Sequence, residues 1–208
     1  MSNSTVKWAI FFIIILGIIG WNHRPVQYDD TFICRDTGAI NATVEPIQGD
    51  PSGRSWNFPP HYALKSLASY TVRARILSAK RYRGGDDGNL APVDLALGWG
   101  PMSKREIIKD IRVWQEGRWY YWQTDKFPIQ SNDIACYSAN LHLIPASPCM
   151  KNGLRALRAG QDVELVGDLV EVTGPNNWHW RSSLSRSDSG DGACELMLVR
   201  KLSYCKGE

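Results

Sequence analysis

A histidine and an aspartate in two different segments are the residues best placed for acid–base chemistry. His142 follows Ser138 and Asn140 at alternate positions, so on an extended strand these three side chains would share one face. Asp94 lies in a separate short apolar segment and would orient the imidazole of His142 as a general base. This pair indicates a hydrolase. The alternative is structural, because a histidine between two leucines is more often a satisfied core or edge residue.

The sequence lacks a motif that would complete such a site. Ser182, Ser183 and Ser185 are not flanked by the glycines of the nucleophile elbow of α/β hydrolases. No Cys-x-x-Cys, His-Glu-x-x-His or calcium-loop spacing occurs, so we expect no metal site, and Asp188 and Asp191 are more typical of a turn. No glycine-rich loop precedes a helix in the pattern that cradles a nucleotide. We therefore expect no cofactor.

Two aromatic segments favour a binding function instead. Trp119-Tyr-Tyr-Trp122 and Trp178-His-Trp-Arg181 interleave aromatic rings with polar groups, as do surfaces that stack on sugars, bases or a partner protein. The alternative is that alternate aromatic side chains fill the core. The binding candidates are Trp119, Trp122, Trp178, Arg181, Arg186 and Asn140.

Length and composition are those of one globular domain with an anchor. The chain has 208 residues, of which 43% are hydrophobic and 22% charged, which excludes disorder as the main state. The net charge is +3, with both signs interspersed along the chain. This charge is too small for an electrostatic footprint on a polyanion, so no nucleic-acid partner is expected.

The segment from Trp8 to Trp21, WAIFFIIILGIIGW, is apolar on every side of a helix. Such a segment needs hydrocarbon or protein all around it, and the tryptophans at both ends suit the two membrane interfaces. Its rise of roughly 21 Å falls short of a hydrocarbon core of about 30 Å, so flanking residues or local thinning must complete the span. We predict a signal anchor within residues 1–22 that contacts the bilayer through residues 8–21. A cleaved signal peptide and a buried helix are the alternatives, although no small-x-small cleavage site follows.

The flanking charges give the orientation of this anchor. Lys7 and the terminal amine precede the helix, whereas Arg24 and Arg35 follow it, so the positive-inside count is nearly tied. A short basic segment before an apolar one resembles the start of an export signal. We therefore expect a single-pass protein of the inner membrane, with its N-terminus in the cytoplasm and its C-terminal domain outside.

Five cysteines leave the redox state open. Two disulfides with one remaining thiol are compatible with the number, and so are reduced, buried cysteines. The connectivity does not follow from sequence. Cys136 and Cys149 form the candidate disulfide.

The chain after the anchor divides into an irregular tether, residues 23–60, and a β-rich domain, residues 61–208. The tether is rich in proline and has little periodicity. In the domain, alternation predicts strands over 70–79, 163–172, 178–184 and 194–202, and a hairpin over 111–124. Ser103 with Glu106, and Ser147 with Pro148, indicate helix starts. The predicted fold class is α+β: a transmembrane helix, then a curved or barrel-like antiparallel β domain with two or three short helices.

Three strings resemble a family of bacterial single-pass membrane-anchored proteins of uncharacterised function. They are LAPVDLALGWGPMS at 90–103, SANLHLIPA at 138–146 and WRSSLSRSDSGDGACEL at 180–196. The resemblance covers roughly residues 70–202. It implies an envelope protein with its domain beyond the inner membrane, and it carries no activity, ligand or catalytic residue. The sequence thus favours a binding, assembly or accessory module of the cell envelope, with a protein partner there, and the alternative is a membrane-tethered hydrolase that uses His142.

Overall fold

The structure is a computed structural model that describes residues 39–58, 61–185 and 193–205. The predicted anchor lies outside these residues. Within them, no helix has the length and apolar character needed to cross a membrane. The elements are β1 (Ile47–Gly49), β2 (Ser55–Phe58), β3 (Tyr62–Arg81), α2 (Asp86–Leu90), β4 (Val93–Gly98), η1 (Gly100–Ser103), α3 (Arg105–Ile108), β5 (Arg112–Glu116), β6 (Trp119–Gln123), α4 (Ser131–Cys136), β7 (Ser138–Pro145), α5 (Pro148–Ala156), β8 (Asp162–Thr173), η2 (Pro175–Asn177), β9 (His179–Arg181) and β10 (Glu195–Tyr204).

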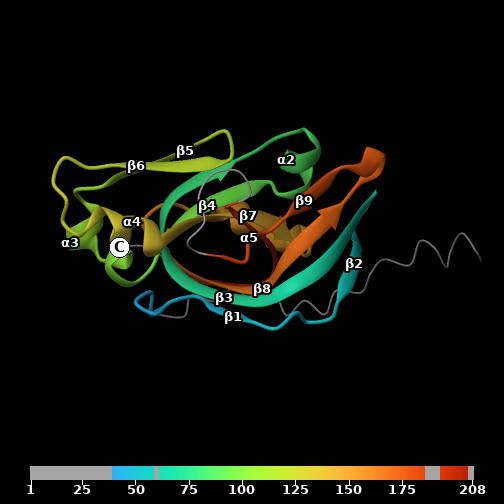
Figure 1. The fold of residues 1–208 in the computed structure, drawn as a ribbon, viewed down its shortest axis with the longest axis horizontal. Coiled ribbons are helices and arrows are strands. Elements are labelled where there is room, and N and C mark those ends of the chain that lie inside the picture. The colour runs from blue at the N-terminus through green and yellow to red at the C-terminus, as the bar shows by residue number, and fades with distance from the viewer. Residues whose placement is uncertain (1–38, 59–60, 186–192, 206–208) are drawn as a thin grey trace, which may run out of the picture.

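Five strands of the main sheet are hydrogen-bonded in a closed ring. The order β3-β4-β7-β10-β8 returns to β3 because β3 also pairs with β8 (Figure 1). β3 can serve both neighbours because it is 20 residues long. Its register runs from Ala63 to Arg75 along β8 and from Arg75 to Arg81 along β4. β1 and β2 pair with β3 outside the ring, and β9 pairs with β8.

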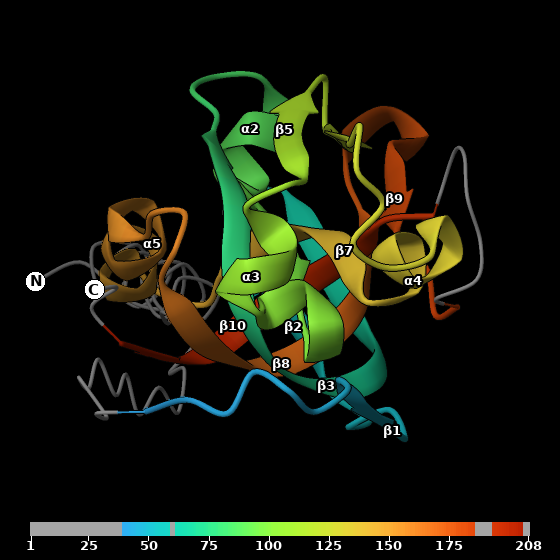
Figure 2. The same ribbon diagram turned by 90° about the vertical axis from the view of Figure 1, so that its left-hand side faces the viewer.

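The inward side chains of the ring form the main core. β3 alternates, so that Val72, Ala74 and Ile76 are buried while the arginines between them point outward. The same core takes leucines and valines from the other four ring strands, and α5 contributes Met150 and Leu154. Figure 2 shows α5 on one flank of the ring and α4 on the opposite flank. Helix α5 therefore closes the barrel interior from one side.

A glycine allows β8 and β10 to approach each other closely. A Cβ atom at Gly167 would lie 1.9 Å from the carbonyl oxygen of Leu198, closer than any real contact. The β8–β10 register also shifts between Val199 and Lys201. Gly167 therefore marks a bend that the ring needs in order to close.

The structure confirms an α+β, mostly β fold with a few short helices. It corrects the purely antiparallel arrangement, because β7 and β10 are parallel. Strands β1 and β2 fall within the stretch 23–60 that the sequence analysis assigned to the tether, and Trp56 of β2 packs in a second core with Leu64 and Val172. The alternation of those two strands is too short to be recognised in a proline-rich stretch.

Of the two predicted helix starts, one is confirmed. Ser147 caps α5 by accepting a hydrogen bond from the Met150 amide at 3.1 Å, and Pro148 occupies the first turn. The capping box at Ser103 is wrong, because its hydroxyl donates to the Gly100 carbonyl within η1 and α3 has no side-chain cap. Ser103 therefore belongs to the 3-10 turn η1 and does not cap α3.

Candidate functional site

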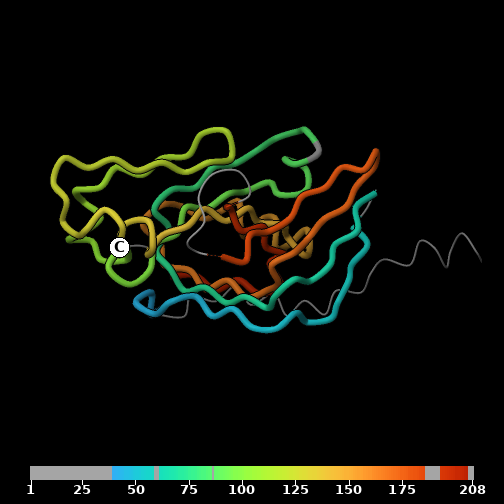
Figure 3. The backbone as a smooth tube through the Cα atoms, viewed as in Figure 1, coloured from blue at the N-terminus to red at the C-terminus, as the bar shows by residue number. Residues whose placement is uncertain are grey.

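The β5–β6 hairpin lies over the outward face of β4 and β7 (Figure 1). It belongs to the long connection between these two strands, and the tube in Figure 3 shows the chain leaving β4, running out along the hairpin and returning to β7. The sequence predicted this hairpin, whose turn is Gly117-Arg118. The outward face beneath it carries Asp94, Ser138, Asn140 and His142, which are all buried. The alternating polar side chains of β7 are thus buried beneath the β5–β6 hairpin and do not face solvent.

Polar contacts hold the inner face of the hairpin to β7. The Gln115 side-chain amide donates to Oδ1 of Asn140 at 2.6 Å, and Asn140 in turn donates to the Arg118 carbonyl at 3.0 Å. The Tyr120 hydroxyl lies 3.2 Å from the Ser138 hydroxyl. Burial raises the pKa of Tyr120, which keeps this phenol neutral. Asn140, a predicted binding residue, therefore fastens the hairpin and faces no open surface.

Apolar packing adds to this attachment at the other end of the hairpin. Trp122 and Val113 pack against a small core of Met102, Ile111 and Ile134. This core joins the hairpin to η1 and α4. Trp122, another predicted binding residue, is thus a packing residue on the covered face.

His142 and Asp94 are direct cross-strand partners in the β4–β7 register. Nδ1 of His142 lies 3.0 Å from Oδ2 of Asp94, and the two side chains are 4% and 0% exposed. The predicted pair is therefore brought together by the register of two strands. The imidazole also packs against Trp180 of β9, with ring centroids 5.0 Å apart.

Arg118, at the tip of the hairpin, is the counterion of Asp94. Its Nη1 donates to Oδ1 of Asp94 at 2.7 Å and to the Ala91 carbonyl at 2.9 Å, while its Nε donates to Asp87 at 3.2 Å. The guanidinium stacks 3.7 Å from the centroid of the Tyr82 ring. The backbone of Arg118 has a φ of 74°, a conformation that favours glycine. The tertiary contacts of its side chain hold it there.

Four buried atoms of this cluster have no aligned hydrogen bond. They are the Tyr82 hydroxyl, Oδ2 of Asp94, Nη2 of Arg118 and Nδ1 of His142. Burial, and then the negative charge of Asp94, raise the pKa of Tyr82 far above its ordinary value. Tyr82 is therefore a neutral phenol at any physiological pH, and the single buried carboxylate is balanced by Arg118.

Two serine hydroxyls that could serve as a nucleophile for this histidine are hydrogen-bonded elsewhere. The Ser182 hydroxyl donates to the Ser183 carbonyl at 2.7 Å and accepts from the Leu196 amide at 3.0 Å. The Ser138 hydroxyl donates to the Ile134 carbonyl at 2.5 Å. Neither hydroxyl contacts the imidazole. In this cluster the buried carboxylate of Asp94 balances the charge of Arg118 and holds the side chains of Arg118 and His142 in place.

The outer face of the hairpin carries one arginine and three aromatic rings. Trp114 and Tyr121 stack with centroids 5.5 Å apart and an interplanar angle of 21°, and the Arg112 guanidinium lies 5.2 Å from the Trp114 centroid. Strand alternation places Trp119, one of the predicted binding residues, on this same face. Tyr121 is 43% exposed. These four residues are called the outer hairpin face below.

The second aromatic segment lies at the β8–β9 edge. Trp178 is half-buried and makes edge contacts with Tyr62 and Trp180 at 5.6 and 6.1 Å. Arg181 is exposed and pairs with Glu171 at 3.0 Å, an acceptor that it shares with His179. Arg186 lies outside the described residues. Trp178 therefore serves the second core, whereas Arg181 faces solvent with its charge already paired.

Cys136 at the end of α4 and Cys149 in α5 are both exposed free thiols in the structure. The disulfide between them stays a prediction. Across the described ranges, no group of three or more histidine, cysteine or acidic side chains is arranged to hold a metal ion.

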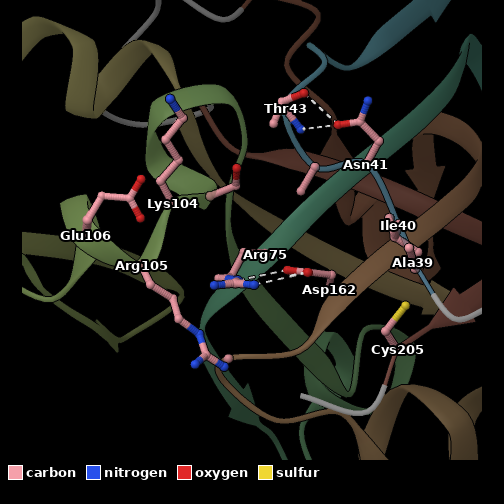
Figure 4. A pocket seen from close by; sticks show the side chains of 13 residues that line it. Ala39, Ile40, Asn41, Thr43, Arg75, Lys104, Arg105, Glu106, Asp162 and Cys205 are labelled. Atoms are coloured by element: carbon pink, nitrogen blue, oxygen red, sulfur yellow. Dashed lines mark hydrogen bonds and ion pairs between the residues drawn. The ribbon is translucent and has the colours of Figure 1, made fainter. Parts of the chain in front are cut away.

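A separate pocket of about 520 Å³ lies where the described chain begins (Figure 4). The Arg75–Asp162 pair forms part of its wall, with Nε to Oδ1 at 2.8 Å and Nη2 to Oδ2 at 3.1 Å. Ala39, Gly160 and Cys205 also line it. The pocket thus lies between the first described residues, the loop after α5 and the end of β10.

No protein-family model, curated protein or solved structure matches the chain. The site must therefore be interpreted from its own geometry.

Sequence reasoning missed Tyr82 and Arg118 beside Asp94, Trp114 on the outer hairpin face, and the contact of Trp180 with His142. Arg118 had a local signal, because a two-residue turn of Gly-Arg places an arginine where glycine or asparagine is usual. Tyr82 and Trp180 had none for these roles, since the contact of Tyr82 with Arg118 and that of Trp180 with His142 depend on tertiary packing.

Proposed function

We propose that the chain is a membrane-anchored envelope protein whose domain binds a partner protein through the outer hairpin face. The observation that carries this proposal is the row formed by exposed Arg112, half-buried Trp114 and exposed Tyr121 on a hairpin that is fastened by its opposite face. Tryptophan, tyrosine and arginine are the residue types that dominate the energy of protein–protein interfaces. The anchor at residues 8–21 would confine that partner to the envelope.

The rigidity of the hairpin supports the assignment. An isolated two-stranded hairpin is at best marginally stable in water. This one is held by the Gln115–Asn140 hydrogen bond, by the packing of Trp122 and by the ion pair of Arg118. Aromatic side chains on a pre-organised support lose little conformational entropy on binding.

The layout of the barrel also supports binding. The ring of five strands, with α5 between its third and fourth strands in chain order, β7 and β8, has the arrangement of small Greek-key barrels of the oligonucleotide- and oligosaccharide-binding type. Such barrels bind ligands on the face of their second and third strands, which correspond here to β4 and β7. In this chain the β5–β6 hairpin occupies that face. We infer that the outer hairpin face provides the contact surface in place of the covered face of β4 and β7.

Site-specific photo-crosslinking in intact cells tests the proposal. A photoreactive amino acid at Gln123, which is exposed and follows Tyr121 on the same face, should give a discrete crosslinked product. The product should disappear in the Trp114→Ala/Tyr121→Ala variant, while the protein level and thermal stability change little. A matched probe at Lys65, on the distant part of β3, should give no such product.

A crosslink that survives loss of both aromatic residues would assign the contact to another surface. Absence of any product from Gln123, with the protein folded and in the membrane, would contradict binding through this face. Loss of the protein from the membrane fraction would contradict the anchor separately.

The second candidate function is the tethered hydrolase, which the 3.0 Å contact between His142 and Asp94 favours. Here the imidazole would act as a general base on a substrate or water that enters beside Trp180. The His142→Gln variant should then abolish turnover of model ester, peptide or phosphoester substrates, whereas Trp114→Ala should leave it unchanged. Equal, background-level turnover by the original protein and both variants would remove this candidate.

A further inference from the structure

Helix α5, the loop that follows it and the end of β3 together carry four basic residues, Arg81, Lys151, Arg155 and Arg158, which are called the cationic patch below. Lys151 and Arg155 are four residues apart on α5 and therefore lie on one side of the helix. Arg81 and Arg158 converge on the last turn, where both donate to the carbonyls of Arg155 and Leu157. Four positive charges are thus gathered within a small part of the surface.

None of these four side chains forms an ion pair with a carboxylate of the described residues. The neighbouring arginines on β3 differ: Arg73 pairs with Glu164 at 2.7 Å, and Arg75 pairs with Asp162 at 2.8 Å. The mutual repulsion in the patch is evident in Arg81, whose pKa is lowered by burial and then by Arg158 and Arg155. The carbonyls at the helix end hold two of the guanidiniums but leave the net charge uncompensated.

The patch lies next to the point where the described chain begins. The pocket in Figure 4 is lined both by Ala39 and by Gly160, which is two residues beyond Arg158. Lys104 and Arg105 extend the positive charge along the pocket rim, although Glu106 accompanies them. The first described residue, Ala39, therefore lies on the same side of the domain as the patch.

We propose that the cationic patch on α5 docks the domain onto anionic phospholipid headgroups of the membrane that anchors the chain. This inference rests on the anchor of the proposed function. The part of the tether before the described residues, residues 23–38, can reach at most roughly 55 Å, so the domain is held near the surface at high effective concentration. Each basic residue near an anionic surface strengthens association on the order of fivefold. Docking would also direct the outer hairpin face, on another side of the barrel, away from the lipid.

The full-length protein reconstituted in lipid nanodiscs tests the docking. A donor dye is placed on the exposed Cys149 of α5 after the other cysteines are replaced by serine, and an acceptor dye is carried by a lipid headgroup. Discs of phosphatidylcholine with phosphatidylglycerol are compared with discs of phosphatidylcholine alone. The energy transfer should be higher with phosphatidylglycerol and should fall as salt is added.

The decisive variant is Lys151→Glu/Arg155→Glu, because these two side chains make no hydrogen bond or ion pair with any described residue. The ratio of docked to free domain should fall on the order of twentyfold or more. Lys65→Glu/Lys126→Glu changes the net charge equally, and both residues are exposed. Lys65 lies opposite Glu171 in the β3–β8 register. This position is about nine strand residues and roughly 30 Å from the α5 end of β8, so the control should dock normally.

Equal energy transfer in the two lipid compositions, or an unchanged signal in the α5 variant, would overturn the docking. A thermal shift produced by inorganic phosphate at matched ionic strength, without lipid dependence, would overturn it in favour of a soluble phosphate ligand. Failure of the chain to enter nanodiscs at all would contradict the anchor, and with it the proposed function.

Discussion

Asp94 accepts from Arg118 on one carboxylate oxygen, at 2.7 Å, and faces His142 with the other, at 3.0 Å. The first contact joins the barrel to the tip of the hairpin, and the second joins two strands within the barrel. A single carboxylate with no solvent exposure therefore links the covering hairpin to the sheet beneath it.

Asp94→Asn should destabilise the domain by about 3 kcal/mol, because it leaves the Arg118 charge partly buried without its nearest counterion. Chemical denaturation followed by tryptophan fluorescence measures the change. The matched control is Asp87→Asn, which removes the 52% exposed partner of the same arginine and should cost less than about 1 kcal/mol. Equal losses in the two variants would mean that Asp94 is not the main counterion.

Arg118→Gly should loosen the hairpin without unfolding the barrel. Glycine relieves the strain of a positive φ, but the variant loses the ion pair and the stacking on Tyr82. Hydrogen exchange should therefore become faster in residues 112–123 and stay unchanged in β3 and β8. Arg118→Lys should restore little of the protection, since an ammonium cannot form the same planar contacts. Unchanged exchange in the glycine variant would show that the inner-face bonds suffice.

The parts of this fold that local chemistry decides could be predicted from sequence, and the others could not. The hairpin at 111–124, the cap at Ser147 and the period-two strands depend on neighbours in the chain. The parallel pairing of β7 with β10 and the closure of β3 on β8 depend on partners far away in the sequence. The contact of His142 with Asp94 follows from residue types plus a register that no local pattern reveals. The role of Arg118 could not be predicted without knowing both the turn that it occupies and the position of the hairpin over β4 and β7.

The two faces of the hairpin should respond differently to loss of a tryptophan. Trp122→Ala removes a ring from the small core at η1 and α4 and should cost about 2 to 3 kcal/mol. Trp114→Ala removes a half-exposed ring whose partners are Tyr121 and Arg112, and should cost about 1 kcal/mol or less. Urea midpoints of the two variants provide the comparison. A larger loss for Trp114 would indicate that the outer face serves stability and would weaken its assignment to binding.

Glu164 should make the stability of the barrel depend on pH in the acid range. Burial of its carboxyl opposes ionisation, but hydrogen bonds from Lys201 and Arg73 outweigh burial and hold the pKa below its ordinary value. A carboxyl whose pKa is lower in the folded state stabilises that state above the unfolded pKa. This contribution is present at neutral pH and is lost as the pH falls through the folded value.

The Glu164→Gln variant, which cannot ionise, should therefore be less stable at pH 7 and should show a flatter loss of stability on acidification. Denaturation midpoints measured in steps from neutral pH to about pH 3 reveal the slope. Because Lys201 contacts only Oε2 and Arg73 only Oε1, each of Arg73→Gln and Lys201→Gln should remove part of the effect. Parallel pH profiles for Glu164→Gln and the original protein would show that this carboxyl does not couple folding to protonation.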